Sequence, residues 1–368
     1  MRMAGKISVA LLVLSFPSNP AIGNSGDRCT KLSALFRETG VTQARAEIAH
    51  PELVLEFPEG SPLPSKMVQQ AEHVIHEVDE MLGGVLRPPK KLKLILSNRS
   101  EKAAALGANP AKGEMPLIYA PFQLESAGRV KHPIFSRAAL AHEYGHILIH
   151  ETFPDWIPGV YRKIERLKRK TLERLKGIGD ETSEYNADLV RKRTLMLSAD
   201  DPRTKELAAL KKALDAAEMK YYEVSIYSSA YQELFADTVA VALEGDGKAI
   251  YRTLHRTGTK DPIKTKLANA RDFTRKYSVS RWRATQKHVY FSPTRAYLWK
   301  HYLSNPEFRR QPQEIVRKLY LAIRREFLDL YSTGKLEKIS PSDANRRMIE
   351  AIERQFAIVD HPQAAFTR

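Results

Sequence analysis

The sequence predicts an α+β fold that is mostly helical, with a small sheet near the N-terminus. Two observations support this prediction. Short apolar segments typical of strands occur before residue 125, whereas longer segments with apolar residues at helical spacing occur throughout the rest of the chain. With 368 residues the chain is long enough to bury one large core or two modest ones, and its composition is that of a folded globular protein.

Strands and helices are both expected before residue 160. The strand segments are short apolar runs, or runs in which leucines alternate with other residues, and prolines bound one of them. The helical segments repeat apolar residues every three or four positions and end at glycine or proline. The expected strands are 53–55, 92–96 and 116–122, and the expected helices are 65–82 and about 135–150.

From about residue 160 to 224 the sequence is charged and helix-forming, and we interpret it as an insertion of about three helices. Turn signals at 177–180 and 200–202 would separate these helices. The helices expected after the insertion are 231–243, 294–302, 312–330 and 342–356. One side of the first inserted helix is basic, and it is either a solvated face or a surface that binds an anionic membrane or polymer. Its residues include Arg162, Lys163, Arg166, Lys168, Arg169 and Lys170.

Residues 1–23 have the three parts of a secretory signal peptide. Arg2 and Lys6 give a basic start, residues 7–16 form an apolar run, and small residues follow at 21–23. The apolar run is too short for a membrane span, which needs about twenty residues. We therefore expect an exported bacterial protein, periplasmic or secreted, whose mature chain has no transmembrane span. The alternative is a hydrophobic first helix packed in the core.

The chain is strongly basic, with a net charge of +16 and a pI of about 9.7. Removing Arg2 and Lys6 with the signal peptide would leave 16 minus 2, or +14. Such a charge attracts anionic partners, for example a membrane surface, a cell-wall polymer or an acidic substrate. No nucleic-acid-binding motif accompanies the charge, so nucleic-acid binding is not expected. Cys29 is the one cysteine, so an intramolecular disulfide is excluded.

Residues 142–146 read His-Glu-Tyr-Gly-His and fall within the helix expected at about 135–150. On a helix His142 and His146 lie one turn apart on the same face, so both imidazoles can bind one metal ion. Glu143 is rotated by about a third of a turn from His142, which suits a base that acts on a water molecule beside the metal. A catalytic zinc ion usually has three protein ligands, so a third ligand must lie elsewhere.

The third ligand that we expect is Glu233. Asp237 follows it by one helical turn, so one carboxylate can bind the metal while the other accepts a hydrogen bond from a ligand imidazole. We prefer this pair to Glu184 and Asp188, which have the same spacing, because the helix around Glu233 is apolar. His150 lies on the same helix face as His146 but is interpreted as a helix-end residue. Weaker candidates for stabilising an oxyanion are Tyr227, Tyr231, His288 and Tyr290.

These motifs together resemble the gluzincin metallopeptidases, the thermolysin-like clan that combines an HExxH helix with a downstream ExxxD helix. No specific family of the clan is identified. The metzincin pattern is rejected because Ile149 and Thr152 stand where it has glycine and histidine. The resemblance implies a zincin-like catalytic domain at 24–290, which contains the insertion, and a helical C-terminal extension at 291–368 packed on it.

The resemblance also implies roles for the motif residues. His142, His146 and Glu233 would bind one catalytic zinc ion, Glu143 would be the general base, and Asp237 would orient a ligand histidine. The strand at 117–121 would be the sheet edge that pairs with the substrate backbone, unless it is an ordinary buried strand.

The sequence therefore predicts an exported zinc-dependent metallopeptidase that hydrolyses peptide or protein substrates. The main alternative is a catalytically inactive zincin-like protein whose basic surface binds anionic cell-envelope polymers or membranes. The presence of all the ligand and base residues favours the enzyme, because an inactive site usually loses one of them. A purely helical polyanion-binding protein with a chance HExxH motif is a third alternative.

Overall fold

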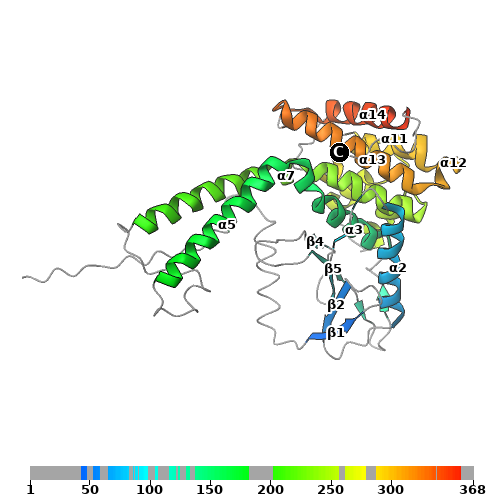
Figure 1. The fold of residues 1–368 in the computed structure, drawn as a ribbon. Helices are drawn as coiled ribbons and strands as arrows, with labels where there is room; N and C mark the ends of the chain where they lie inside the picture. Colours follow the sequence, from blue (N-terminus) through cyan, green and yellow to red (C-terminus); the bar gives the residue numbers. More distant parts are fainter. Residues whose placement is uncertain are drawn as a thin grey trace, which may run out of the picture. The chain divides into compact units, whose positions relative to one another are not determined.

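The structure is a computed structural model of the chain, and the described residues divide into two compact units. Residues 157–181 and 202–225 form the first unit, and the other described residues form the second (Figure 1). The expected signal peptide, Cys29 and the rival pair Glu184 and Asp188 lie outside the described residues. The described residues are 43–47, 53–58, 65–82, 86, 88–89, 91–97, 104–106, 116–121, 123–124, 130–132, 137–181, 202–256, 262–278, 287–336 and 338–357.

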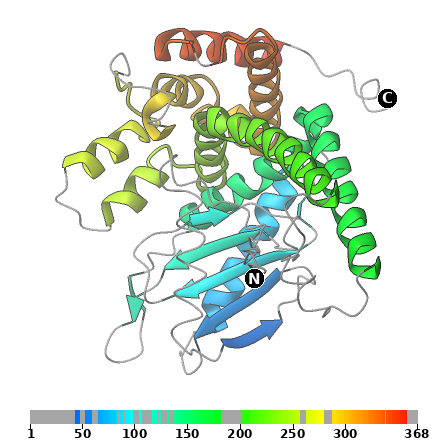
Figure 2. The same ribbon diagram turned by 90° about the vertical axis from the view of Figure 1, so that its left-hand side faces the viewer.

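A five-stranded sheet lies in the second unit, with its strands in the order β1-β2-β3-β5-β4 (Figure 2). The three central strands are parallel, and each edge strand is antiparallel to its neighbour. Strands β6 and β7 form a separate antiparallel pair. The strands are β1 (Gln43–Glu47), β2 (Leu53–Pro58), β3 (Leu92–Ser97), β4 (Ala104–Leu106), β5 (Leu117–Pro121), β6 (Gln123–Leu124) and β7 (Val130–His132).

Helix α2 (Ser65–Leu82) makes the crossover between the parallel strands β2 and β3, and it lies along one face of the sheet (Figures 1 and 2). The apolar spacing that predicted this helix also defines its buried side, because Ala71, Ile75, Val78 and Leu82 are all buried. The mostly helical α+β class predicted from the sequence is therefore confirmed.

The edge role expected for residues 117–121 is wrong, because β4 pairs with β5 on the side away from β3. The pairing runs from Ala104 opposite Tyr119 to Leu106 opposite Leu117. Strand β4 has three residues, too few for an alternating pattern to be recognised in the sequence. It closes most of the edge that a substrate backbone would otherwise use.

The remaining helices of the second unit include α3, which carries the HExxH motif. Helix α3 lies against α2 and against strands β4 and β5. Trp156, at the end of α4, contacts α13, because its indole N–H donates to the Tyr320 hydroxyl at 3.1 Å. These helices are α3 (Arg137–Glu151), α4 (Phe153–Trp156), α8 (Ala249–Arg256), α9 (Pro262–Ala270), α10 (Lys287–Tyr290), α11 (Ser292–Leu298), the π-helix η2 (Trp299–Leu303), α12 (Pro306–Arg309), α13 (Pro312–Ser332) and α14 (Pro341–Ala357).

Helix α7 (Pro202–Glu244) is one continuous helix of 43 residues, so the separate helix expected at 231–243 is wrong. Proline occurs in it only at its first position, and glycine is absent until Gly245, which has a φ of +63° and ends the helix. The turn expected at 177–180 is also wrong, because α5 (Pro158–Glu181) continues through it. A glycine costs a helix only about 1 kcal/mol relative to alanine and does not by itself end it.

In the first unit, α5 packs against the first part of α7 through a small apolar cluster. Ile164, Leu214 and Ala217 are buried in it. The opposite side of α5 is exposed and predominantly basic, as expected from the sequence. Among the helices that the structure describes, none combines the length and the apolar character needed to cross a lipid bilayer.

Helices α3 and α7 approach each other closely at Gly145. A Cβ atom on Gly145 would lie 3.0 Å from the Cα atom of Ala236, 3.3 Å from its Cβ and 3.6 Å from the Cβ of Val239. A contact of 3.0 Å is shorter than most contacts of Cβ atoms in proteins, and the backbone of Ala236 cannot rotate away as a side chain can. The helix contact therefore depends on the missing side chain of Gly145.

We expect Gly145→Ala to lower the free energy of unfolding by up to about 2 kcal/mol, because overpacking costs about 1–3 kcal/mol and the gain in helix propensity offsets about 1 kcal/mol of it. Chemical denaturation measures the change. Gly159→Ala is the matched control, since Gly159 is also helical and a Cβ there would have no atom within 4 Å. A Gly145→Ala protein as stable as this control would contradict the close contact of the two helices.

Candidate metal centre

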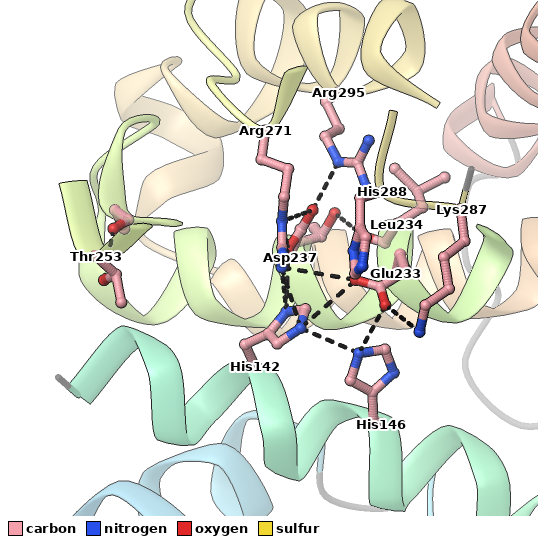
Figure 3. Close-up of polar contacts among 12 residues, drawn as sticks. His142, His146, Glu233, Leu234, Asp237, Thr253, Arg271, Lys287, His288 and Arg295 are labelled. Carbon is pink, nitrogen blue, oxygen red and sulfur yellow. Dashed lines mark hydrogen bonds and ion pairs between the residues drawn. The ribbon is translucent and has the colours of Figure 1, made fainter. Parts of the chain in front are cut away.

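Helices α3 and α7 bring three potential metal ligands together. His142 and His146 extend from α3, and Glu233 extends from the facing side of α7 (Figure 3). One ligand atom from each residue lies within 4.8 Å of the other two, so the group could hold a metal ion. The structure thus brings together the three residues that the sequence predicted as ligands.

The distances among the ligand atoms fit a tetrahedral site. The Nε2 atoms of His142 and His146 are 3.0 Å apart. The Glu233 carboxylate is 3.6 Å from Nε2 of His142 through Oε2 and 3.5 Å from Nε2 of His146 through Oε1. With zinc bonds of about 2.0–2.1 Å, two ligands of a tetrahedral ion lie about 3.4 Å apart. Two imidazoles and one carboxylate at these separations fit a zinc ion with little rearrangement.

The protonation states at this site also suit metal binding. Burial lowers the pKa of His142 to about 3, and the charges of Arg271 and His146 add to this effect, so the imidazole is neutral near pH 7. Burial by itself would raise the pKa of Glu233, but His288, His146 and Lys287 outweigh it and hold that pKa well below its usual value. Neutral imidazole and ionised carboxylate are the forms that bind metal ions.

Asp237 lies one turn beyond Glu233 and contacts the other nitrogen of the His142 ring. Its Oδ1 atom is 3.0 Å from Nδ1 of His142. This contact places the ring proton on Nδ1 and leaves the lone pair of Nε2 directed to the potential metal position. Asp237 is the residue for which the resemblance implied an orienting role.

Two buried arginines, Arg271 and Arg295, also contact the carboxylate of Asp237. The Nε atom of Arg271 is 3.0 Å and 3.1 Å from the two Asp237 oxygens, and Nε of Arg295 is 2.8 Å from Oδ2. Burial opposes ionisation of Asp237, but these two guanidinium groups outweigh it and lower its pKa. Asp237 therefore remains a carboxylate although it is completely buried.

Arg271 also approaches the potential metal position. Its Nη2 atom is 3.0 Å from Nε2 of His142 and 3.6 Å from Oε2 of Glu233. A metal ion at Nε2 requires this Nη2 atom to move away from the imidazole. The same Nη2 atom also donates to Oδ1 of Asp237, and the guanidinium group is planar and rigid, so this movement would also change the contacts between Arg271 and Asp237.

Helix α10 contributes two further basic residues that face Glu233. Lys287 Nζ is 2.7 Å from Oε1 of Glu233, and His288 Nδ1 is 3.0 Å from Oε2. Their side chains are 42% and 35% exposed, unlike those of the buried arginines. His288 and Tyr231 were both weaker candidates from the sequence for stabilising an oxyanion. His288 lies at the centre, whereas Tyr231 packs in the aromatic core, with its ring 4.7 Å from that of Phe291.

Glu143 follows His142 on α3 and is half-buried. Burial raises its pKa, His146 opposes this shift, and the nearby charge of Glu233 adds to it. A carboxylate with a raised pKa is a stronger base, which suits proton transfer near neutral pH. His150, in contrast, packs against Phe153 with ring centroids 5.4 Å apart and is not part of the metal-binding group.

Sequence reasoning missed Arg271, Arg295 and Lys287. They follow Asp237 by tens of residues and belong to no spacing motif, so only the folded chain places them at the site. One signal was present for Arg295, which occurs in a short helix next to Leu298 and Phe291, both buried. A charged residue in such surroundings needs a buried partner.

Comparison with known proteins adds no family to this description: the chain matches no family model, and no curated protein or solved structure is significantly similar to it.

Proposed function

We propose that the protein is a zinc-dependent metallopeptidase of the zincin type. The observation that carries this proposal is the approach of His142, His146 and Glu233, with ligand-atom separations of 3.0, 3.5 and 3.6 Å. The gluzincin-like order of the motifs, with Glu143 inside the first and Asp237 inside the second, supports the same function. The signal-peptide pattern further supports export to the periplasm or the medium.

The set of donor atoms favours zinc over other common divalent ions. Calcium and magnesium prefer sites made of oxygen atoms. Two imidazole nitrogens with one carboxylate are typical of catalytic zinc sites, which keep one position open for substrate or water. When bound, zinc would polarise the peptide carbonyl and increase the acidity of a water molecule.

The chain's own residues would supply the proton transfers. Glu143 would accept a proton from the attacking water and then donate it to the nitrogen of the leaving amine. Its raised pKa makes the carboxylate a better proton acceptor and keeps the later donation accessible. Asp237 would hold His142 in one tautomer, with Arg271 and Arg295 fixing the carboxylate of Asp237.

A second candidate function concerns the exposed side of α5. Beside the basic residues lies Leu172, whose side chain is 59% exposed. Lysine and arginine residues on an exposed helix face attract an anionic membrane surface, and an exposed leucine can insert into it. The exposed basic residues are Arg162, Lys163, Arg166, Arg169, Lys170 and Lys176.

Replacing Glu143 by glutamine keeps the size of the side chain and removes the base. We expect zinc to stay bound while peptide hydrolysis falls by about 10²- to 10⁴-fold. Metal analysis and turnover of a quenched fluorescent peptide measure the two properties on one sample. Full activity in Glu143→Gln would rule out the proposed mechanism.

Replacing Glu233 by alanine removes a ligand, so zinc affinity and hydrolysis should fall together. Asp237→Asn should weaken zinc binding by about 10- to 100-fold, because it retains an acceptor near His142 but leaves the buried arginines without an anion. Chelator competition measures the affinities, and circular dichroism checks folding. Glu184→Ala is the control and should bind zinc normally. Normal binding by Glu233→Ala with loss in Glu184→Ala would overturn the ligand assignment.

Reversing the charges of Arg162, Arg166 and Arg169 tests the second candidate. We expect weaker binding to vesicles that contain anionic lipid, with a salt dependence that is smaller than for the wild type. Hydrolysis of a small neutral peptide should remain unchanged, since these residues belong to the first unit and the metal centre to the second. Equal binding of the wild type and the variant to these vesicles would show that the basic side of α5 is not a membrane-binding surface.

A further inference from the structure

Among the described residues around the candidate metal centre, the negative and positive charges are equal in number when no metal ion is counted. The carboxylates of Glu143, Glu233 and Asp237 face the cationic side chains of Arg271, Arg295 and Lys287. With neutral imidazoles, this cluster has no net charge. A divalent ion would give it two positive charges in excess, and a site with excess positive charge favours an anionic ligand.

The three cationic side chains differ in their exposure to solvent and in the carboxylate that they contact. Arg271 and Arg295 are 7% and 0% exposed, and both contact Asp237. Lys287 is 42% exposed, and its ammonium group contacts Oε1 of Glu233. Lys287 is therefore the cation at this site that combines access to solvent with a position beside a metal ligand.

A metal ion and Lys287 would compete for the charge of Glu233. Once Glu233 binds a divalent ion, most of its negative charge is compensated and its attraction for the ammonium group is weaker. A lysine side chain is long and flexible, so its ammonium group can turn to another anion without movement of the backbone. That anion would lie within a few ångströms of the metal-binding residues.

We propose that Lys287 binds a carboxylate of the substrate, an inference that rests on the proposed zinc peptidase function. The site would thus favour peptides that have a negative charge next to the bond that is cleaved. The carboxylate is either the C-terminus of the peptide or an acidic side chain. Both present the same two oxygens to the ammonium group.

Binding to zinc-loaded Glu143→Gln protein tests this proposal without the need for turnover. Three hexapeptides are compared by calorimetry: one blocked at both ends and uncharged, one with the same residues and a free C-terminal carboxylate, and one blocked with a single glutamate. We expect at least one acidic peptide to bind about tenfold or more tightly than the uncharged one, as for a hydrogen bond between charged groups. The stronger of the two acidic peptides identifies the source of the carboxylate.

Adding Lys287→Met should remove this preference and leave binding of the uncharged peptide within about twofold. Lys287→Arg should retain part of it, because arginine also binds carboxylates. Lys300→Met is the matched control, since Lys300 is an exposed lysine of the same unit, and it should keep the full preference. Without zinc the preference should be much smaller, because Lys287 then remains with Glu233.

Equal binding of all three peptides by the zinc-loaded Glu143→Gln protein overturns the proposal, as does a preference that survives Lys287→Met. Either result leaves the peptidase function intact, provided that the wild type hydrolyses peptides and Glu143→Gln does not. A protein that binds no zinc fails the proposed function itself, and the two failures are therefore distinguishable.

Discussion

The close approach of α3 and α7 is the constraint on which the candidate metal centre depends. His142 and His146 lie on one helix and Glu233 on the other, so the spacing of the helices sets the distances between the ligand atoms. The contact is possible because Gly145 has no side chain where it faces Ala236. Gly145 lies within the HExxH motif itself, so one segment supplies both the ligands and the packing that positions them.

A second constraint is electrostatic. Three carboxylates in mostly apolar surroundings would be strongly unfavourable without compensating charge. The charge of Asp237 is compensated by Arg271 and Arg295, which are also buried. Glu233 is compensated at the more exposed side, by Lys287 and His288. The buried arginines hold the carboxylate that contacts His142, whereas Lys287 and His288 are partly exposed to solvent.

Local sequence patterns predicted much of this fold because the spacing of apolar residues reflects which side of a helix or strand is buried. The helix at 65–82 and the strands β2, β3 and β5 follow from apolar spacing, and His142, His146 and Glu233 follow from helical periodicity. The continuous α7 was missed because its composition changes from charged to apolar after about residue 224, although no proline or glycine interrupts the helix there. Strand β4 was too short to recognise, and Arg271 and Lys287 reach the site only through tertiary folding.

The residues around the candidate centre come from segments far apart in the chain. His142 and Arg271 are separated by 129 positions, and Asp237 and Arg271 by 34. Contacts between distant positions form slowly, because closing long loops costs entropy before the contacts offset it. A partly folded chain can already have the two histidines of α3, yet it lacks the third ligand and the orienting carboxylate. The complete candidate centre is therefore a late product of folding, and a newly made chain lacks it until the distant segments of the second unit have come together.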